Sequence, residues 1–277
     1  MGQDQHAGAR ARPGRWILIA LGVAIPAIPV AIGIVLGLGQ PGAGAASANT
    51  TTSAFTPVPS HSSAPAHHNS PPGLLVPPGP GAIVALLVHP TALFAAPRSG
   101  RVLAQLPTRT QFGSPETALV VSQSGGWLGV VVPQAGNGHI GWITVNAVTL
   151  ARIHWELKVS LAARRLTVLE AGKVVERYPV AIGEPSAPTP TGRFAVTDRL
   201  STGDPSGPYG CCILALSAHS PHAIQGWDGG NRIAIHSTPE VSSIGEAASH
   251  GCVRVTLPDG RWLLAHIPLG TPTLISS

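Results

Sequence analysis

The chain has few charged side chains and almost no lysine. Only 10% of its 277 residues are charged, and lysine occurs only as Lys158 and Lys173. The formal net charge of +5 therefore rests on arginine. The sequence has no lysine-rich tract and no interleaving of basic with aromatic residues, although nucleic-acid-binding surfaces favour both. The composition argues against a nucleic-acid partner.

Cysteine is also scarce, since the chain contains only Cys211, Cys212 and Cys252. An odd number of cysteines makes a poor disulfide framework, and adjacent cysteines rarely bridge because the geometry is strained. We therefore expect Cys211 and Cys212 to pack as small apolar side chains in a strand. The lack of a Cys-x-x-Cys pair disfavours a zinc knuckle. Cys252 is left as the thiol available for chemistry.

The N-terminal part predicts export. Residues 1–15 are basic, and residues 16–39 carry no charge and can cross a hydrocarbon core of about 30 Å as a helix. No lysine or arginine follows until Arg98, so the positive-inside rule puts residues 1–15 in the cytoplasm and the later domains outside. The triplet Ala46-Ser47-Ala48 has the form of a signal cleavage site, which leaves secretion after cleavage as the alternative to a membrane anchor.

Residues 40–80 are rich in Pro, Ser, Thr, Ala and Gly and contain no acidic or basic side chain apart from histidine. Such a segment cannot bury enough apolar surface to offset its chain entropy, which predicts a disordered linker. We expect its histidines, His61, His67 and His68, to be solvated rather than bound to a metal.

Residues 81–150 read as a small β-domain, because short β-prone runs alternate with glycine and proline. The runs cover residues 83–88, 118–122, 127–132 and 139–145, and the glycines at 125–126 and 136–138 predict hairpin turns. The stretch 124–130, followed by Gly141-Trp142-Ile143, resembles a bacterial SH3-like domain. That resemblance implies a small β-barrel, which serves either as a spacer or as a binder of peptide or glycan.

Residues 154–277 predict a second, mainly β domain with long loops. The expected strands cover residues 157–160, 165–170, 174–182, 192–198, 233–236 and 252–257. Residues 171–173 fit a hairpin turn, and residues 260–266 fit one short helix that Asp259 would cap.

Cys252 stands in the run Ser249-His250-Gly251-Cys252-Val253-Arg254, downstream of His236. A free thiol has a pKa of about 8.5 and attacks well only as the thiolate, so it needs a base near neutral pH. A strand that ends at His236 and one that begins at Cys252 can lie side by side, which would bring imidazole and sulfur together. This pairing is typical of acyl transfer through a thioester.

The neighbours of the pair suggest supporting roles. Ser237 is the expected group that orients the base, through its hydroxyl or its carbonyl. The N–H groups of Gly251 and Cys252 can face a developing oxyanion. Arg254 either binds a carboxylate or braces the loop. Zinc binding by His236, His250 and Cys252 is a rival reading, but no glutamate stands beside these residues to activate water.

The motifs Ile235-His236-Ser237-Thr238, Ile244-Gly245 and Ser249 to Arg254 together resemble the L,D-transpeptidases with a YkuD-type catalytic domain. Residues 165–173, 189–194 and 207–210 are similar to further stretches of that family, in the same order. The resemblance implies a YkuD-like β-sandwich, here preceded by an SH3-like β-barrel and an N-terminal transmembrane helix.

The resemblance also implies roles for individual residues. Cys252 would be the nucleophile, His236 the general base and Ser237, where many relatives have glycine, the group that orients the base. The residues implied at the oxyanion and substrate sites are Ser249, His250, Gly251, Arg254 and Tyr209. The implied reaction takes a peptidoglycan tetrapeptide stem, releases D-alanine and joins the thioester to an amine of another stem in a 3→3 crosslink, with no metal or organic cofactor.

Other readings stay open at this point. Water as the acceptor would make the protein an L,D-carboxypeptidase, and a protein amine would make it a protein-to-wall ligase. A wall-binding scaffold with a dormant site is the non-enzymatic alternative. The family resemblance implies acylation by carbapenems, which a dormant site would lack.

Overall fold

The computed structural model describes residues 79–222 and 230–277. The expected membrane segment at 16–39, the linker histidines and nearly all of the 40–80 linker lie outside these ranges, so they stay predictions. Among the helices in the described ranges, none is both long and apolar enough to cross a membrane.

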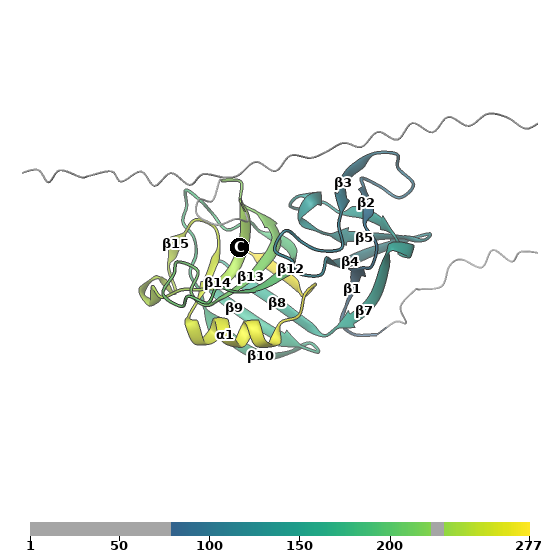
Figure 1. Ribbon diagram of the computed structural model, residues 1–277. Coiled ribbons are helices and arrows are strands. Elements are labelled where there is room, and N and C mark those ends of the chain that lie inside the picture. The colour runs from purple at the N-terminus through teal and green to yellow at the C-terminus, as the bar shows by residue number, and fades with distance from the viewer. Residues whose placement is uncertain (1–78, 223–229) are drawn as a thin grey trace, which may run out of the picture. The chain divides into compact units, whose positions relative to one another are not determined.

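The first domain is a seven-stranded antiparallel sheet in the order β3-β2-β6-β5-β4-β1-β7 (Figure 1). Leu93, Leu128 and Ile143 are at most 1% exposed and belong to a core of this domain's own. The elements are β1 (Ala82–Leu87), β2 (Thr91–Phe94), β3 (Val102–Leu106), β4 (Thr117–Ser124), β5 (Trp127–Val131), η1 (Pro133–Ala135), β6 (Gly141–Thr144), η2 (Val145–Ala147) and β7 (Val148–Ile153).

The hairpin predicted at Gly125 and Gly126 is confirmed. Both residues join β4 to β5 with positive φ, 51° and 84°, which two-residue hairpins need and glycine adopts at little cost. Strands β2, β3 and β7 were not predicted from the sequence. The prediction missed β3 because Val102 and Leu103 are exposed there, so the usual alternation of buried and exposed positions is lost. The SH3-like character of this domain stays a prediction.

The second domain is a mixed eight-stranded sheet in the order β10-β9-β8-β17-β12-β13-β14-β16. The first residues of β12 pair with β17 and its later residues pair with β13, so this strand belongs to both halves of the sheet. The elements are β8 (Trp155–Ser160), β9 (Arg165–Glu170), β10 (Lys173–Pro179), β11 (Ile182–Gly183), β12 (Gly192–Ser201), β13 (Cys212–His219), β14 (Arg232–Ser237), η3 (Val241–Ser243), β15 (Ala247–Ser249), β16 (Val253–Val255) and β17 (Pro272–Ser276), where β11 and β15 form a separate parallel pair.

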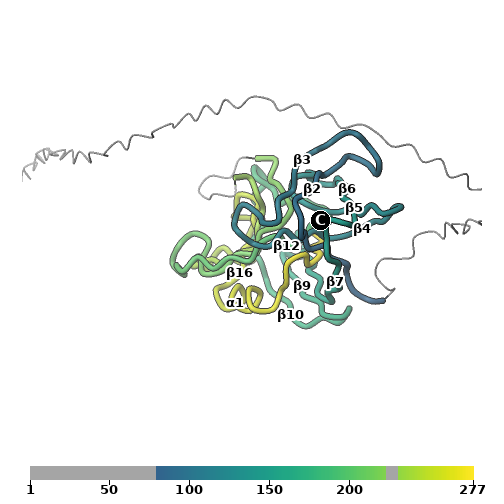
Figure 2. Tube along the Cα trace, turned by 45° about the vertical axis from the view of Figure 1, so that its right-hand side comes forward, coloured from purple at the N-terminus to yellow at the C-terminus, as the bar shows by residue number. Residues whose placement is uncertain are grey.

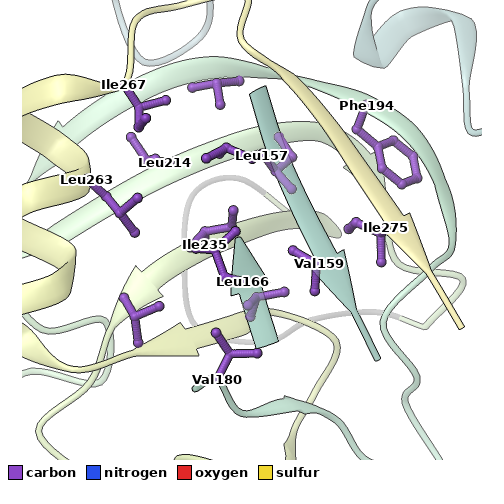
Figure 3. Packing of buried hydrophobic residues seen from close by; sticks show 14 of the residues in the cluster. Leu157, Val159, Leu166, Val180, Phe194, Leu214, Ile235, Leu263, Ile267 and Ile275 are labelled. Atoms are coloured by element: carbon purple, nitrogen blue, oxygen red, sulfur yellow. The ribbon is translucent and has the colours of Figure 1, made fainter. Parts of the chain in front are cut away.

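Apolar side chains from both halves of the second sheet share one core (Figure 3). Leu157 and Val159 come from β8, Leu214 from β13 and Ile235 from β14, and none is more than 2% exposed. Burying a side chain of this size stabilises the fold by about 1.5–3 kcal/mol relative to leaving it in water. The prediction of a mainly β protein is confirmed.

The helix α1 (Leu257–His266) starts earlier than predicted, and its cap is Thr256. The Thr256 hydroxyl accepts from the Asp259 N–H at 3.4 Å and donates to the Asp259 carboxylate at 2.6 Å. The prediction of Asp259 as the cap is wrong, because Asp259 lies inside the first turn, where its negative charge favours the helix dipole. In both views α1 lies at the same end of the domain as β10 (Figures 1 and 2), and Trp262 packs edge-on against Tyr178 there.

Candidate active site

His236 lies near the end of β14, a strand of six residues that are all buried. β13 flanks this strand in the antiparallel direction and β16 in the parallel direction. Because side chains alternate along a strand, Ile233 and Ile235 enter the main core while Ala234 and His236 face the other side of the sheet. The imidazole is therefore carried by a strand that is paired on both sides, which holds its backbone rigidly.

Cys252 directly precedes β16, in which Val253 is in register with Ile235. This register brings Cys252 beside Ala234, with which it packs in a small apolar cluster. Cys252 and His236 are only 6% and 3% exposed, and both line one cavity. The sequence prediction that the histidine strand and the cysteine strand lie side by side is confirmed.

A backbone carbonyl sets the orientation of the imidazole. Nδ1 of His236 lies 2.8 Å from the carbonyl oxygen of Ser237. A carbonyl only accepts hydrogen bonds, so Nδ1 carries the hydrogen and Nε2 keeps its lone pair. The sequence left the hydroxyl and the carbonyl of Ser237 as alternatives, and the hydrogen bond uses the carbonyl. The hydroxyl accepts instead from the Cys212 N–H at 3.1 Å.

Tyr209 covers the imidazole from the side. Its ring stands edge-on to the His236 ring, with 5.0 Å between the centroids and 70° between the planes. Tyr209 belongs to the turn that leads into β13 and lines the same cavity. Burial raises the pKa of its phenol, and the nearby Cys252 sulfur adds to this. The ring is placed to restrict movement of the imidazole.

Burial keeps both members of the pair uncharged. It lowers the pKa of His236 to about 4, although the bond to the Ser237 carbonyl acts in the other direction. It raises the pKa of the Cys252 thiol to about 11, against the opposing influence of the Ala234 backbone and the Arg254 charge. An imidazole is neutral above its pKa and a thiol is neutral below its own. At pH 7 the site therefore holds a neutral thiol and a neutral imidazole.

The cavity has a volume of about 240 Å³ and draws its walls from three parts of the chain. They are the turn before β13, the end of β14 and the segment around β16. The lining residues are Pro208, Tyr209, His236, Ser249, His250, Cys252 and Arg254. Of the site residues predicted from the sequence, Ser237 and Gly251 stand outside this lining, and Pro208 is an addition.

The loop before the thiol is held by Ser249. Its hydroxyl donates to the Cys252 carbonyl at 2.5 Å and accepts from the Gly251 N–H at 3.1 Å. Gly251 has a φ of 116°, a backbone conformation that residues other than glycine rarely adopt. The Gly251 N–H, one of the two expected oxyanion donors, is thus engaged by Ser249 in this structure.

Arg254 ties the loop to its surroundings. Its Nη1 forms an ion pair with Glu240 at 3.1 Å, and its backbone exchanges two hydrogen bonds with Ala181. Its Nε is buried and has no partner among the residues that the structure describes. These contacts brace the loop, one of the two expected roles, and leave Nε unused. No sequence pattern marks Glu240 as the partner.

Cys211 and Cys212 form a disulfide, and Cys252 is the free cysteine. The expectation that the adjacent pair packs as free thiols in a strand is therefore wrong. In a continuous strand, neighbouring side chains point to opposite faces and cannot meet. Here Cys211 still belongs to a turn and only Cys212 belongs to β13, so the turn brings the two sulfurs together. A boundary of this kind is difficult to place from the sequence.

No group of three or more His, Cys, Asp or Glu side chains within residues 79–222 and 230–277 is arranged to hold a metal ion. His236, His250 and Cys252 line the same cavity. They do not form a metal-binding group in the described residues, so the structure gives the alternative hypothesis of a zinc site no support.

Residues 155–275 match the YkuD family model, described as an L,D-transpeptidase catalytic domain. A Bacillus licheniformis protein provisionally named L,D-transpeptidase YkuD is 34% identical over 124 residues, which cover 45% of this chain and 67% of that protein. A Bacillus subtilis protein provisionally named L,D-transpeptidase YqjB is 32% identical over 129 residues, covering 43% of this chain and 69% of that one. The matched part contains the whole candidate site.

Among solved structures, an L,D-transpeptidase from Xylanimonas cellulosilytica is 25% identical with a TM-score of 0.34, and the match covers 46% of this chain and 62% of that one.

Proposed function

This chain belongs to the L,D-transpeptidase family, and from that premise we propose that it is a peptidoglycan L,D-transpeptidase that works through a cysteine thioester. The observation that carries the proposal is the shared cavity of Cys252 and His236, with Nδ1 of the imidazole bonded to the Ser237 carbonyl. Cys252 is the nucleophile and His236 the general base. The Ser237 carbonyl keeps the base in the tautomer that the reaction needs.

The first half-reaction acylates the enzyme. Nε2 of His236 accepts the thiol proton while the Cys252 sulfur attacks the carbonyl at the L-centre of the third residue in a donor tetrapeptide stem. The carbon–nitrogen bond to the terminal D-alanine then breaks, and the imidazolium returns the proton to the leaving nitrogen. The products are free D-alanine and a thioester on Cys252. Because the pair starts neutral, charge separates only as the bond forms.

The developing oxyanion needs a donor, and we assign the Cys252 N–H to this role. The Gly251 N–H already donates a hydrogen bond to the Ser249 hydroxyl, so its contribution is to hold the loop in place. Removing one oxyanion donor typically costs about 3 kcal/mol in the transition state. The cavity residues Tyr209, His250 and Arg254 contact the stem peptide, and the unused Nε of Arg254 suits a carbonyl or carboxylate of the substrate.

The second half-reaction transfers the acyl group. The side-chain amine of a second stem attacks the thioester, His236 takes up the amine proton, and the sulfur leaves with a proton from the imidazolium. The product is a 3→3 crosslink, and the thiol is restored. One amide is broken and one is formed over the cycle, so the exchange balances without a further reactant.

We place this chemistry outside the cytoplasm, in the cell envelope. The apolar segment 16–39 after the basic residues 1–15 suits a membrane anchor, and secretion after cleavage near Ala46 is the alternative. The Cys211–Cys212 disulfide supports an exported domain, because disulfides persist in oxidising compartments. The domain at 81–150 would set the reach of the catalytic domain at 154–277 or hold wall polymer.

A carbapenem tests the nucleophile. The full-length chain is incubated with the drug and its intact mass is measured, for the wild type and for Cys252→Ala. We expect an adduct of one drug molecule on the wild type and none on the variant. A wild type that stays unmodified would favour the non-catalytic scaffold over the enzyme.

The roles of the base and its orienting group are tested by rate. His236→Ala removes the proton acceptor and should slow acylation by about 10²–10⁴-fold, the usual contribution of a general base. Ser237→Ala keeps the backbone carbonyl that bonds Nδ1, so its loss should be far smaller. Equal, near-normal rates in both variants would refute these assignments.

A purified disaccharide-tetrapeptide identifies the acceptor. Crosslinked dimer together with released D-alanine is the expected product. Tripeptide without dimer would reassign the protein as an L,D-carboxypeptidase, and transfer only to a protein amine would make it a protein-to-wall ligase.

A further inference from the structure

The Cys211–Cys212 disulfide lies against the residue that orients the catalytic base. The Cys211 sulfur is 3.5 Å from the Ser237 hydroxyl oxygen, and the Cys212 N–H donates to the same oxygen at 3.1 Å. The carbonyl of Ser237 in turn holds Nδ1 of His236 at 2.8 Å. A single residue, Ser237, thus links the disulfide to the imidazole in a continuous chain of contacts.

The bridge determines how the Ser237 hydroxyl is bonded. A disulfide sulfur carries no hydrogen, so across the 3.5 Å contact the hydroxyl is the only donor. The other acceptors in reach are the carbonyls of Tyr209 at 3.4 Å and Cys212 at 3.5 Å. Reduction would place new S–H donors beside this oxygen and beside the Leu257 carbonyl, 3.9 Å from the Cys211 sulfur. The donor and acceptor pattern around Ser237 would then change.

Ser237 has little room in which to accommodate such a change. It is fully buried. A Cβ at Gly210 would come within 2.5 Å of its hydroxyl oxygen, and a Cβ at Gly260 within 2.7 Å of its own Cβ. The backbones of two elements, the turn before β13 and helix α1, therefore pack directly against this side chain. If the turn that holds the disulfide shifts, it must either displace Ser237 or lose contact with it.

The same turn carries the ring that covers the base. Tyr209 precedes Gly210 and the disulfide, and its ring stands edge-on to His236. Hydrogen bonds from Thr202 to the carbonyls of Gly210 and Cys211 hold the end of this turn. The disulfide restrains the backbone at the same point, directly after Tyr209 and Gly210 and in contact with Ser237.

We propose that the Cys211–Cys212 disulfide is a positioning element for His236, which holds Ser237 and Tyr209 against the imidazole, and that its reduction slows acylation of Cys252. The inference rests on the proposed function for its kinetic consequence. Neither cysteine touches the reacting atoms, so the pair acts through Ser237 and Tyr209.

The chemical step is a two-electron reduction. A phosphine attacks one sulfur, the S–S bond breaks, and water delivers oxygen to phosphorus. The products are two thiols and one phosphine oxide, and the phosphine supplies both electrons. In the cell envelope an exported dithiol would be the reductant, becoming a disulfide itself. Cys252 is already a thiol and is unchanged.

The experiment begins with a thiol count on the full-length chain. Unfolded without reductant, the native protein should show one thiol, and after phosphine treatment it should show three. The mass should rise by that of two hydrogens. Three thiols in the native protein would overturn the proposal, because the bridge would not exist.

Acylation by a carbapenem is then compared between the oxidised and the reduced wild type, after removal of the phosphine without air. We expect reduction to slow acylation by about 10- to 100-fold, as misplacement of a catalytic group commonly does. Reoxidation should restore the rate, which excludes unfolding as the cause. The Cys211→Ser, Cys212→Ser double variant should match the reduced form and no longer respond to phosphine.

A pH profile separates positioning from mere stabilisation. A loosened imidazole is better hydrated, so its pKa should rise toward the ordinary value and it should become protonated between pH 7 and 5. The acylation rate of the reduced form should therefore fall over this range, whereas the rate of the oxidised form should stay level. Identical rates and profiles in the two forms would overturn the proposal.

Nitrogen NMR of the imidazole gives a readout that needs no activity. His236 should be the Nδ1–H tautomer in the oxidised protein and a mixture of tautomers after reduction. If the oxidised protein is never acylated but this signal changes, the proposed function fails while the positioning role stands. An unchanged signal would refute the positioning role by itself.

Discussion

His236 and Cys252 are both neutral because their side chains are buried. Desolvation lowers the pKa of the imidazole to about 4 and raises that of the thiol to about 11. The site is therefore not a preformed thiolate–imidazolium pair. In the proposed reaction, proton transfer therefore accompanies attack by the sulfur, and this predicts how the rate depends on pH.

We expect the rate of carbapenem acylation to change by less than about twofold between pH 6 and 8, because neither group titrates there. An ordinary thiol with a pKa of about 8.5 would gain about tenfold for each pH unit below that value. Stopped-flow measurement over this range distinguishes the two. A steep, log-linear rise would mean that a thiolate in equilibrium with solvent is the attacking species.

At this scale the sequence predicted two residues that share a cavity but not all of their neighbours. The resemblance to a family assigns the proposed nucleophile and base to Cys252 and His236, and both line the cavity. The choice of the Ser237 carbonyl over its hydroxyl depends on ring orientation, which no pattern encodes. The Cys211–Cys212 bridge depends on where a turn ends, and sequence reasoning locates such ends only to within a few residues.

Helix α1 contains a glycine in its interior that its packing explains. Gly260 lies against Ser237, and a Cβ there would come 2.7 Å from the Ser237 Cβ. Alanine is ordinarily the better helix former by about 1 kcal/mol. Close approach of the helix to β14 outweighs that preference, which links the helix to the orientation of the base.

Gly260→Ala should therefore lower stability by about 1–3 kcal/mol, the usual effect of overpacking, and slow acylation as well. Urea unfolding and the carbapenem rate measure the two effects. Gly100→Ala is the matched control, since a Cβ at Gly100 meets nothing within 4 Å. A more stable Gly260→Ala variant would show that helix propensity decides instead.

Strands were easier to predict than the helix start. The strand at Arg165–Glu170 is confirmed with the same bounds, because its alternating pattern and glycine turn agree. The start of α1 was predicted too late, because Pro258 and Gly260 are poor helix formers by propensity. The Thr256 side chain and tertiary contact with β14 override that weakness.

On the scale of the whole molecule, the two sheets meet through polar contacts at the end of β13 and within β12. Asn137 bonds the backbone of His219 at 2.7 and 2.8 Å, and Thr110 donates to Asp198. Buried beside them is Glu116, only 2% exposed. Its pKa is raised to about 7 by burial and by Asp198, against the pull of Arg232. The junction therefore holds a proton that most carboxyls release.

Glu116→Gln should increase stability at high pH. Between pH 4.5 and 7 the unfolded chain releases the Glu116 proton while the folded protein keeps it, so stability falls as pH rises. A glutamine avoids this loss, and we expect the variant to exceed the wild type by about 2–3 kcal/mol at pH 8. The difference should vanish near pH 4.5.

Denaturant unfolding at the two pH values measures the difference. His236 acts in the opposite sense, since its lowered pKa removes stability as pH falls from 6.5 to 4, but it is common to both proteins and cancels. Glu170→Gln, at an exposed position of β9, is the control. A constant gap between Glu116→Gln and wild type would assign the effect to packing rather than to the proton.

The division into domains at 81–150 and 154–277 was a prediction from composition, and the sheets at 82–153 and 155–276 are compatible with it. The junction itself was not predicted. Glu116, Asp198 and Arg232 lie far apart in the sequence, and no spacing rule connects them. Only folding shows that their side chains share a buried site.

The parallel pairing of β14 with β16 has a last consequence. Parallel neighbours cannot be joined by a tight turn, so the chain must leave His236, travel around and return to Cys252 from the same direction. Extra residues inserted in that return path, after Glu240 for example, would leave the strand register unchanged. Such insertions would lengthen the connection while His236 and Cys252 stayed at the same cavity. The length of this connection can therefore vary independently of the pairing that places the two residues together.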